Sequence, residues 1–286
     1  MSYAGFYINL DRSAARRAAV EAQLAKFGLS DRYHRFAAVE GNPAGIINPG
    51  IAPGEVGCLL SHLTLLKQNV GAGLHVHVME DDVLLSRHTR PAIETVIASG
   101  LIDDYDLLFT ETFIPPLARE LGRLKALYDR QVASAPGPGE RRLNLAVVEY
   151  FHATSSYIAN KNAIGRVVAV LDRAVAEGAK MPVDFLIRDA YLKQTLKVGC
   201  LFPFVTAVQF DWTGEQTITG RRRDARTAAA LALARRSFFV DANIAELSAL
   251  ADKLIVPSGD PHARLLGQVL ALHADPRAST NVPDQS

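Results

Sequence analysis

The sequence contains few cysteines, no long apolar run and almost no net charge, and each of these absences excludes a class of protein. Cys58 and Cys200 are its only cysteines, too few for a disulfide framework, so a reducing compartment suits the chain. It has no stretch of about 18 uninterrupted apolar residues that could span a bilayer. Asp11 and Arg12 interrupt the first apolar run too early for a secretory signal. With 31 basic and 30 acidic residues, the net charge is only +1, so the chain has no overall positive field that would attract nucleic acid. We therefore expect a cytoplasmic chain without a nucleic-acid partner.

A glycine-rich dinucleotide fingerprint is also lacking where the chain opens. Residues 5–10 predict a buried strand and residues 11–13 a polar turn. Apolar residues then recur at helical spacing from Val20 to Phe27, before Gly28 as a stop signal. Strand, turn and helix are a typical opening of a nucleotide-binding fold. Because no Gly-x-Gly-x-x-Gly pattern follows the strand, a pyrophosphate wrapped tightly at this first turn is not supported.

Strand and helix patterns alternate through the following 180 residues, which predicts the α/β class. The expected strands cover residues 35–41, the start of 74–85, 105–110, 147–150, 156–159, 199–202 and 204–208. The expected helices cover residues 54–67, 89–98, 163–177 and 185–197. Residues 113–142 show a less regular pattern, and we expect little regular structure there.

We expect the chain to fall into three parts. Residues 1–220 form the α/β domain, residues 221–275 a small all-helical extension, and residues 276–286 a polar, disordered tail. The helical patterns of the extension cover residues 224–237, 242–253 and 262–273.

Three consecutive acids, Glu80, Asp81 and Asp82, follow the apolar strand pattern of residues 74–85 and form the strongest functional signal. Ligands of open α/β sheets bind beyond the carboxyl ends of the strands. Acids this close repel one another unless a cation, a positive group or water holds them. One or two of these carboxylates could hold Mn²⁺ or Mg²⁺ while substrate phosphates complete its shell. The alternative is a solvated turn whose acids cap the next helix.

Other candidate residues have plainer explanations. His75 and His77 share one face of the same strand, but His75 lies too far along it from Asp82 for a compact zinc cluster. We therefore expect core or edge histidines. Asp104 and Asp106 spell a literal Asp-x-Asp, yet they precede their strand and so stand at the edge away from ligands.

Four blocks taken together resemble glycosyltransferase family 25, the bacterial lipopolysaccharide and collagen galactosyltransferase group. They are Tyr-Ile-Asn-Leu-Asp-Arg-Ser (residues 7–13) with Arg16 and Arg17, Arg-Phe-Ala-Ala-Val-Glu-Gly (35–41), Gly-Glu-Val-Gly-Cys-Leu-Leu-Ser-His (54–62) and Glu-Asp-Asp-Val (80–83). The blocks keep the family's order and approximate spacing, and the resemblance thins after residue 86. It implies a GT-A-type fold, a nucleotide-binding α/β sheet flanked by helices. It also implies a nucleotide-sugar donor, usually UDP-galactose, and a divalent metal.

The resemblance assigns roles to residues in these blocks. Asn9, Asp11 and Arg12 would border the nucleotide, and Ser61 and His62 would support or contact it. With no paired acid at a suggestive spacing, these last two residues do not predict a serine hydrolase.

The three acids would be the chain's variant of the family's Asp-x-Asp motif. Asp82 would be the direct metal ligand. Asp81 would be a second metal ligand or a contact to the donor sugar, and Glu80 would support the donor site. The metal would stabilise the nucleoside diphosphate leaving group.

An inverting transfer also needs a carboxylate that takes the proton of the acceptor hydroxyl. Asp184 is the first candidate, with Glu215 and Asp189 behind it. Asp184 stands between Pro182 and a predicted helix, so a helix N-cap explains it equally well.

The C-terminal part departs from the family pattern. Where a Ser-Asp-Ile-like segment would follow Trp212, residues 214–218 read Gly-Glu-Gln-Thr-Ile. Residues 221–223 are three arginines, which either start a solvated helix or meet phosphates or a lipid-linked acceptor at the inner membrane. The helical extension is a candidate homodimer seam.

The leading hypothesis is a metal-dependent inverting glycosyltransferase that uses a UDP-sugar, with galactose as the first candidate sugar. Its acceptor would be a hydroxyl of a bacterial glycan, lipopolysaccharide or other glycoconjugate. One alternative is a nucleotidyltransferase that makes a nucleotide sugar. Another is a non-catalytic scaffold that keeps a glycosyltransferase fold.

Overall fold

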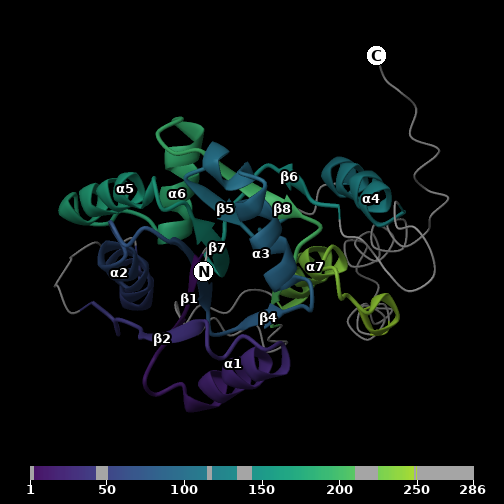
Figure 1. Cartoon of the computed structure of the whole chain (residues 1–286), viewed down its shortest axis with the longest axis horizontal. Helices are drawn as coiled ribbons and strands as arrows, with labels where there is room; N and C mark the ends of the chain where they lie inside the picture. Colours follow the sequence, from purple (N-terminus) through teal and green to yellow (C-terminus); the bar gives the residue numbers. More distant parts are fainter. Residues whose placement is uncertain are drawn as a thin grey trace.

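The computed structural model describes residues 3–42, 51–114, 118–133, 144–209 and 225–247, together with residue 249 (Figure 1). Its strands are β1 (Tyr3–Asn9), β2 (Tyr33–Ala37), β3 (His75–Glu80), β4 (Val83–Leu85), β5 (Leu107–Phe109), β6 (Ala146–Val148), β7 (Ser156–Ala159), β8 (Val198–Phe202) and β9 (Thr206–Val208). Its helices are α1 (Ala14–Lys26), α2 (Pro53–Gln68), α3 (Thr89–Ala98), the short 3-10 helix η1 (Leu101–Asp104), α4 (Ala118–Ala133), α5 (Ile164–Ala176), α6 (Val183–Leu192) and α7 (Ala225–Ser237). The predicted α/β class, a sheet flanked by helices, is confirmed.

Within these described residues, seven strands form one sheet in the order β2-β1-β3-β7-β5-β8-β6. Strands β2, β1, β3, β5 and β8 run in one direction, whereas β7 and β6 run antiparallel to their neighbours. β4 follows β3 after a two-residue turn and pairs with β9 outside this sheet. The carboxyl ends of the parallel strands therefore meet at one edge, together with the residues that precede β7.

Helices cover both faces of the sheet (Figure 1). Helices α2, α5 and α6 pack together on one face, where Leu65 and Val78 share a core. Helices α1 and α3 lie on the other face, where Val20 and Ile93 pack with Met79. Successive residues of a strand point to opposite faces, so Val78 and Met79 belong to different cores. Burial on both faces explains why β3 reads as an almost continuous apolar run.

Most of the expected elements are confirmed with shifted ends. α3 and β7 lie at the expected residues, whereas the strand expected at 35–41 is β2, which begins earlier and ends at Ala37. The expectation of little regular structure at 113–142 was wrong, because α4 occupies the middle of that segment. Leu121 and Leu124 of α4 are buried and three residues apart, as one face of a helix requires.

Helix α7 packs against the α/β domain. The Phe238 ring, directly after the helix, lies 5.4 Å from the Phe202 ring of β8, centroid to centroid. Phe239 forms an isolated bridge with Phe204. The first helix after residue 220 is thus tied to the main core.

Several expectations fall on the part of the chain that the structure does not describe. Glu215, the arginines at 221–223 and the helical pattern at 262–273 lie outside the described residues. The domain division at residue 220, the disordered tail, the homodimer and the membrane contact stay predictions. Within the described ranges, no helix is both long and apolar enough to cross a bilayer.

Candidate active site at the carboxyl edge of the sheet

A cavity of about 380 Å³ lies beyond the carboxyl ends of β1, β2 and β3. The turn after β1, the segment after β2, the first half of α2 and the turn after β3 surround it. Its lining residues are Ile8, Leu10, Arg12, Ser13, Arg16, Ala38, Val39, Gly41, Gly54, Cys58, Ser61, His62, Glu80, Asp81 and Asp82. A volume of this size suits a small-molecule ligand. The structure therefore brings most of the residues predicted for the donor and the metal to one cavity.

Asp81 is fixed by two groups that approach it from the first strand and helix. Asn9 at the end of β1 donates its side-chain amide to Asp81 Oδ2 at 2.7 Å. The guanidinium of Arg16 in α1 donates to Asp81 Oδ1 at 3.0 Å. Both carboxylate oxygens of Asp81 thus have hydrogen-bond donors, and Asn9 acts on the cavity through Asp81.

Arg12 is part of the cavity lining, whereas its neighbour Asp11 is not. Arg35, in the middle of β2, donates to Asn9 Oδ1 at 3.0 Å and to Asp11 Oδ1 at 2.5 Å. The hydrogen bond and charge of Arg35 lower the pKa of the exposed Asp11 carboxyl. Arg12 lines the cavity and pairs with Glu40 at the surface. Arg12 and Arg16 supply the positive charge on this side.

Ser61 joins helix α2 to the segment after β2. Its hydroxyl donates to the Gly57 carbonyl at 2.7 Å and accepts a hydrogen bond from the Val39 backbone N–H at 2.8 Å. A Cβ at Gly57 would lie 2.5 Å from the Val39 carbonyl oxygen, so only glycine allows this close approach. Ser61 and Gly57 therefore fix one wall of the cavity.

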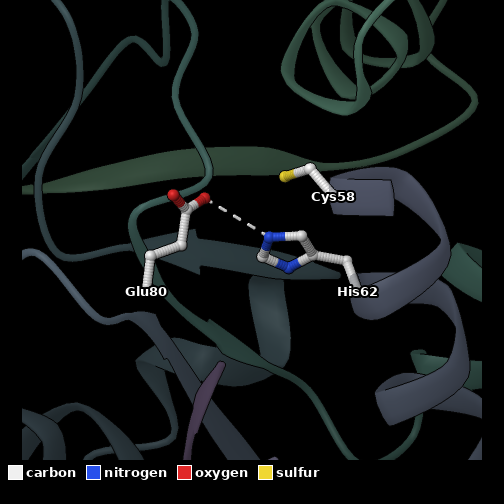
Figure 2. Close-up of side chains that lie close together, drawn as sticks. All are labelled: Cys58, His62 and Glu80. Atoms are coloured by element: carbon white, nitrogen blue, oxygen red, sulfur yellow. Dashed lines mark hydrogen bonds and ion pairs between the residues drawn. The ribbon is translucent and has the colours of Figure 1, made fainter. Parts of the chain in front are cut away.

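Glu80 and His62 form the base of the cavity, with Cys58 beside them (Figure 2). His62 Nε2 lies 3.4 Å from Glu80 Oε1, and His62 Nδ1 lies 2.9 Å from the Tyr157 hydroxyl. Thr154 donates its hydroxyl to Glu80 Oε1 at 2.8 Å. Burial acts to raise the pKa of Glu80, but the hydrogen bond and charge of His62 outweigh it and lower the pKa. Glu80 is therefore a well-anchored carboxylate.

Cys58, His62 and Glu80 offer potential ligand atoms within 4.8 Å of one another. Cys58 and His62 point toward Glu80 from successive turns of one helix (Figure 2). Burial, followed by the charges of Glu80 and Asp184, raises the pKa of the Cys58 thiol well above its usual value. Because the thiolate is the metal-binding form, we interpret this trio as a buried polar anchor for Glu80.

Asp82 differs from its two neighbours because one of its oxygens is buried without a donor. Among the described residues, Asp82 Oδ1 is buried and has no hydrogen-bond partner. Burial and the charge of Glu80 raise the pKa of Asp82 to about 7. A divalent cation would supply the missing partner, and carboxylate oxygens are the ligands that Mn²⁺ and Mg²⁺ prefer. The donor set fits the predicted metal, with Asp82 as the available ligand.

A buried ion pair that the sequence did not predict stands behind these acids. Glu111, two residues after β5, is fully buried and pairs with Arg235 of α7. Arg235 also donates to the Ser155 hydroxyl at 2.9 Å. Burial alone would lower the pKa of Arg235, but the Glu111 charge outweighs it and raises the pKa; the charges of Asp82 and Glu80 act in the same direction. Arg235 therefore contributes positive potential to the acidic turn.

Asp184 and Asp189, the described candidates for the base, lie on α6 and outside the lining of the cavity. Asp184 Oδ2 lies 3.3 Å from His152 Nδ1. Asp189 accepts a hydrogen bond at 2.7 Å from Lys193, whose side chain is largely exposed. The charge of Asp184 contributes to the raised pKa of Cys58 in the cavity wall. Glu215 lies outside the described residues.

Comparison with known proteins supplies the class of enzyme. The family model of glycosyltransferase family 25, described as a lipopolysaccharide biosynthesis protein family, matches residues 47–187. Residues 47–187 belong to glycosyltransferase family 25. This family 25 region contains the acidic turn, Ser61 and His62, and it extends to Asp184. The chain thus carries a glycosyltransferase region, which implies a sugar donor and an acceptor glycan.

The other comparisons are more distant. No curated protein matched the sequence. Among solved structures, the chain is similar to a crystal structure of the galactosyltransferase LgtC in complex with donor and acceptor sugar analogues. The two share 12% identity, the alignment covers 80% of this chain and 94% of that chain, and the TM-score is 0.39. A likeness at this distance transfers neither residue roles nor a substrate.

Proposed function

We propose that the protein is a metal-dependent, inverting glycosyltransferase that transfers a sugar from a UDP-sugar donor. Galactose is the first candidate sugar, and the acceptor is a hydroxyl of a bacterial glycan, lipopolysaccharide or another glycoconjugate. The observation that carries the proposal is the buried, unpartnered Oδ1 of Asp82 in a cavity of about 380 Å³ at the carboxyl edge of the sheet. That edge is where α/β sheets bind nucleotides, and the surrounding region belongs to a glycosyltransferase family.

The donor side of the cavity suits a nucleoside diphosphate. Arg12 and Arg16 supply positive charge, and Gly54 in the first turn of α2 brings a helix N-terminus to the wall. Mn²⁺ or Mg²⁺ at Asp82 would neutralise the charge that develops on the diphosphate leaving group. Asp81, held by Asn9 and Arg16, is placed to contact the donor sugar or to complete the metal shell. These features support the GT-A-type interpretation.

The acceptor side needs a group that accepts a proton from the attacking hydroxyl. Asp184 is the first candidate because it is partly exposed and held beside His152 at 3.3 Å. Asp189 is a weaker candidate because it pairs with Lys193 in solvent. Glu215, which lies outside the described residues, stays a candidate behind Asp184. A carboxylate that removes the proton as the new bond forms is what an inverting displacement requires.

Thermal unfolding in the presence of UDP and Mn²⁺ tests the donor part of the proposal. The two ligands together should raise the melting temperature, because a ligand that binds only the native state stabilises it. Asp82→Ala should remove this rise. Asp104→Ala is a matched control, because Asp104 is an exposed acid at the other end of the sheet.

The result that would overturn the donor assignment is an unchanged melting temperature at saturating UDP and Mn²⁺. Replacing UDP-galactose with UDP-glucose in an assay of UDP release then identifies the sugar. Release of pyrophosphate from UTP and a sugar phosphate would instead favour a nucleotidyltransferase.

A further inference from the structure

Three rings from three separate segments are stacked beside Asp184. Phe113 lies after β5, His152 before β7 and Phe185 in the first turn of α6. The Phe113 and His152 ring centroids are 4.3 Å apart with planes at 22°, and the His152 and Phe185 centroids are 5.1 Å apart with planes at 19°. Phe113 N–H donates to the His152 carbonyl at 2.9 Å, which fixes the inner part of the stack.

The outer ring of this stack is presented to solvent. The Phe185 side chain is 49% exposed, and it is the only aromatic side chain among the large exposed hydrophobic residues of the described chain. One Asp184 oxygen accepts the Phe185 backbone N–H at 3.0 Å, and the other faces His152 at 3.3 Å. The stack and the carboxylate therefore form one rigid unit with an open aromatic face.

This unit is close to the donor cavity. Thr154, two residues after His152, donates to Glu80 at the base of the cavity. Cys58 lines the cavity and lies within the influence of both the Glu80 and the Asp184 charges. Thr154 therefore connects the segment of His152 to the Glu80 end of the cavity.

The chemistry of the unit favours a neutral sugar ring over other ligands. The C–H face of a pyranose packs on an aromatic ring, while its hydroxyls donate hydrogen bonds to a carboxylate at the ring's edge. A phosphate group would be repelled by Asp184 and attracted to Arg12 and Arg16 of the cavity lining. An apolar peptide segment would cover the Asp184 carboxylate without offering it a further hydrogen-bond donor.

We propose that the exposed face of Phe185, with Asp184 at its edge, is the subsite for the sugar ring of the acceptor. The inference rests on the proposed glycosyltransferase function. It adds a residue for acceptor recognition, because Phe185 packs against the sugar ring of the acceptor. Asp184 lies beside the hydroxyls of that sugar ring. His152 and Phe113 are positioning residues that support Phe185 from behind.

Saturation-transfer NMR with simple glycosides tests the subsite without knowledge of the natural acceptor. The probes are methyl β-D-galactopyranoside, methyl β-D-glucopyranoside and methyl N-acetyl-β-D-glucosaminide, each with and without UDP and Mn²⁺. At least one probe should receive saturation at its ring protons from the wild-type protein. Phe185→Ala should reduce this signal at least fivefold, while Phe185→Tyr should retain it. Leu192→Ala is the matched control, because Leu192 is 62% exposed at the opposite end of α6.

The outcomes separate the subsite from the proposed function. A signal that persists in Phe185→Ala would overturn the subsite, as would the lack of a signal from every probe with the wild-type protein. A stabilising effect of UDP and Mn²⁺ that is the same in Phe185→Ala and wild type would show that the donor site is intact. If UDP and Mn²⁺ stabilise neither protein, the donor assignment fails, while the glycoside signals still decide the subsite.

Discussion

Two groups of acids stand at opposite ends of the parallel strands in the main sheet. The acidic turn (residues 80–82) follows β3 at the carboxyl edge, whereas Asp104 and Asp106 precede β5 at the amino edge. Asp104 and Asp106 spell the literal Asp-x-Asp, and the acidic turn spells only a variant of it.

The two groups differ in what their oxygens contact. Asp106 Oδ1 accepts from Arg166 at 2.5 Å and Oδ2 accepts from the Lys197 backbone N–H at 2.8 Å, so the carboxylate is fully used within the fold. Asp82 Oδ1 is buried without a partner among the described residues. A buried carboxylate with both oxygens satisfied stabilises a turn, and one with a free oxygen can accept a cation. Position in the sheet, more than the spelling of a motif, separates the two roles.

The largest expected effect comes from removing the carboxylate charge at each end in turn. Asp82→Asn should lower the rate of sugar transfer about a thousandfold, because a metal supplies several kcal/mol of charge stabilisation to the transition state. Asp104→Asn should leave the rate within about twofold of wild type. UDP release in the presence of acceptor measures both. Equal losses in the two variants would remove the distinction between the edges.

The second prediction concerns the buried ion pair at the ligand edge. Arg235→Met leaves Glu111 buried without a cation and should lower the free energy of unfolding by about 3 kcal/mol. Combining it with Glu111→Gln should recover part of that loss, because the unpaired charge is then removed. Urea unfolding followed by circular dichroism measures the three variants. A double variant no more stable than Arg235→Met would argue against the pair as the cause.

A smaller loss is expected at the amino edge. Asp106→Asn removes the charge that accepts from Arg166 and Lys197, and should lower the free energy of unfolding by about 2 kcal/mol. The stabilising effect of UDP and Mn²⁺ should remain, in contrast to Asp82→Ala. Asp103→Asn, in the exposed part of the neighbouring 3-10 helix, provides the control. If Asp106→Asn removed the UDP effect, the amino edge would have a role in ligand binding.

The effect that is smallest at neutral pH lies between the two edges, at His77 in the middle of β3. Burial lowers the pKa of His77 to about 3, and its ring contacts Tyr33 and Ser156. Below pH 6.5 the unfolded chain therefore binds a proton at His77, whereas the folded protein keeps this imidazole neutral until the pH approaches 3. The stability that depends on neutral His77 is complete above pH 6.5 and declines as the pH falls toward 3, by up to about 1.4 kcal/mol per pH unit.

Replacing His77 with glutamine should reduce the slope of the free energy of unfolding against pH by the contribution of one proton. Urea unfolding at several pH values between 7.5 and 4.5 measures the slope for both proteins. Identical slopes would mean that other groups account for the acid sensitivity.

Local patterns in the sequence were enough to predict much of the fold. The acidic turn could be placed at the carboxyl edge because an apolar strand leads directly into it. Helix α4 was missed, although Leu121 and Leu124 have the required spacing, because Gly122 lies between them and glycine disfavours a helix interior.

The contacts that complete the site could not be predicted in the same way. Arg16 reaches Asp81 across 65 residues, Thr154 reaches Glu80 across 74, and Arg235 reaches Glu111 across 124. No local spacing encodes such pairs, because they form only when the strands have taken their order in the sheet. Likewise, nothing in the sequence around His152 predicts that its side chain contacts Asp184.

The link between Arg235 and Glu111 also bears on how the protein is made. Every described residue in the lining of the cavity precedes residue 83, so this lining is synthesised early. The guanidinium that pairs with Glu111 nevertheless belongs to Arg235, which leaves the ribosome 124 residues later. A nascent chain that stops at Gly220 contains every described lining residue of the cavity but leaves Glu111 beside Ser155 without its cation. We expect such a truncated chain to show no stabilisation by UDP and Mn²⁺, which would make α7 necessary for a working site.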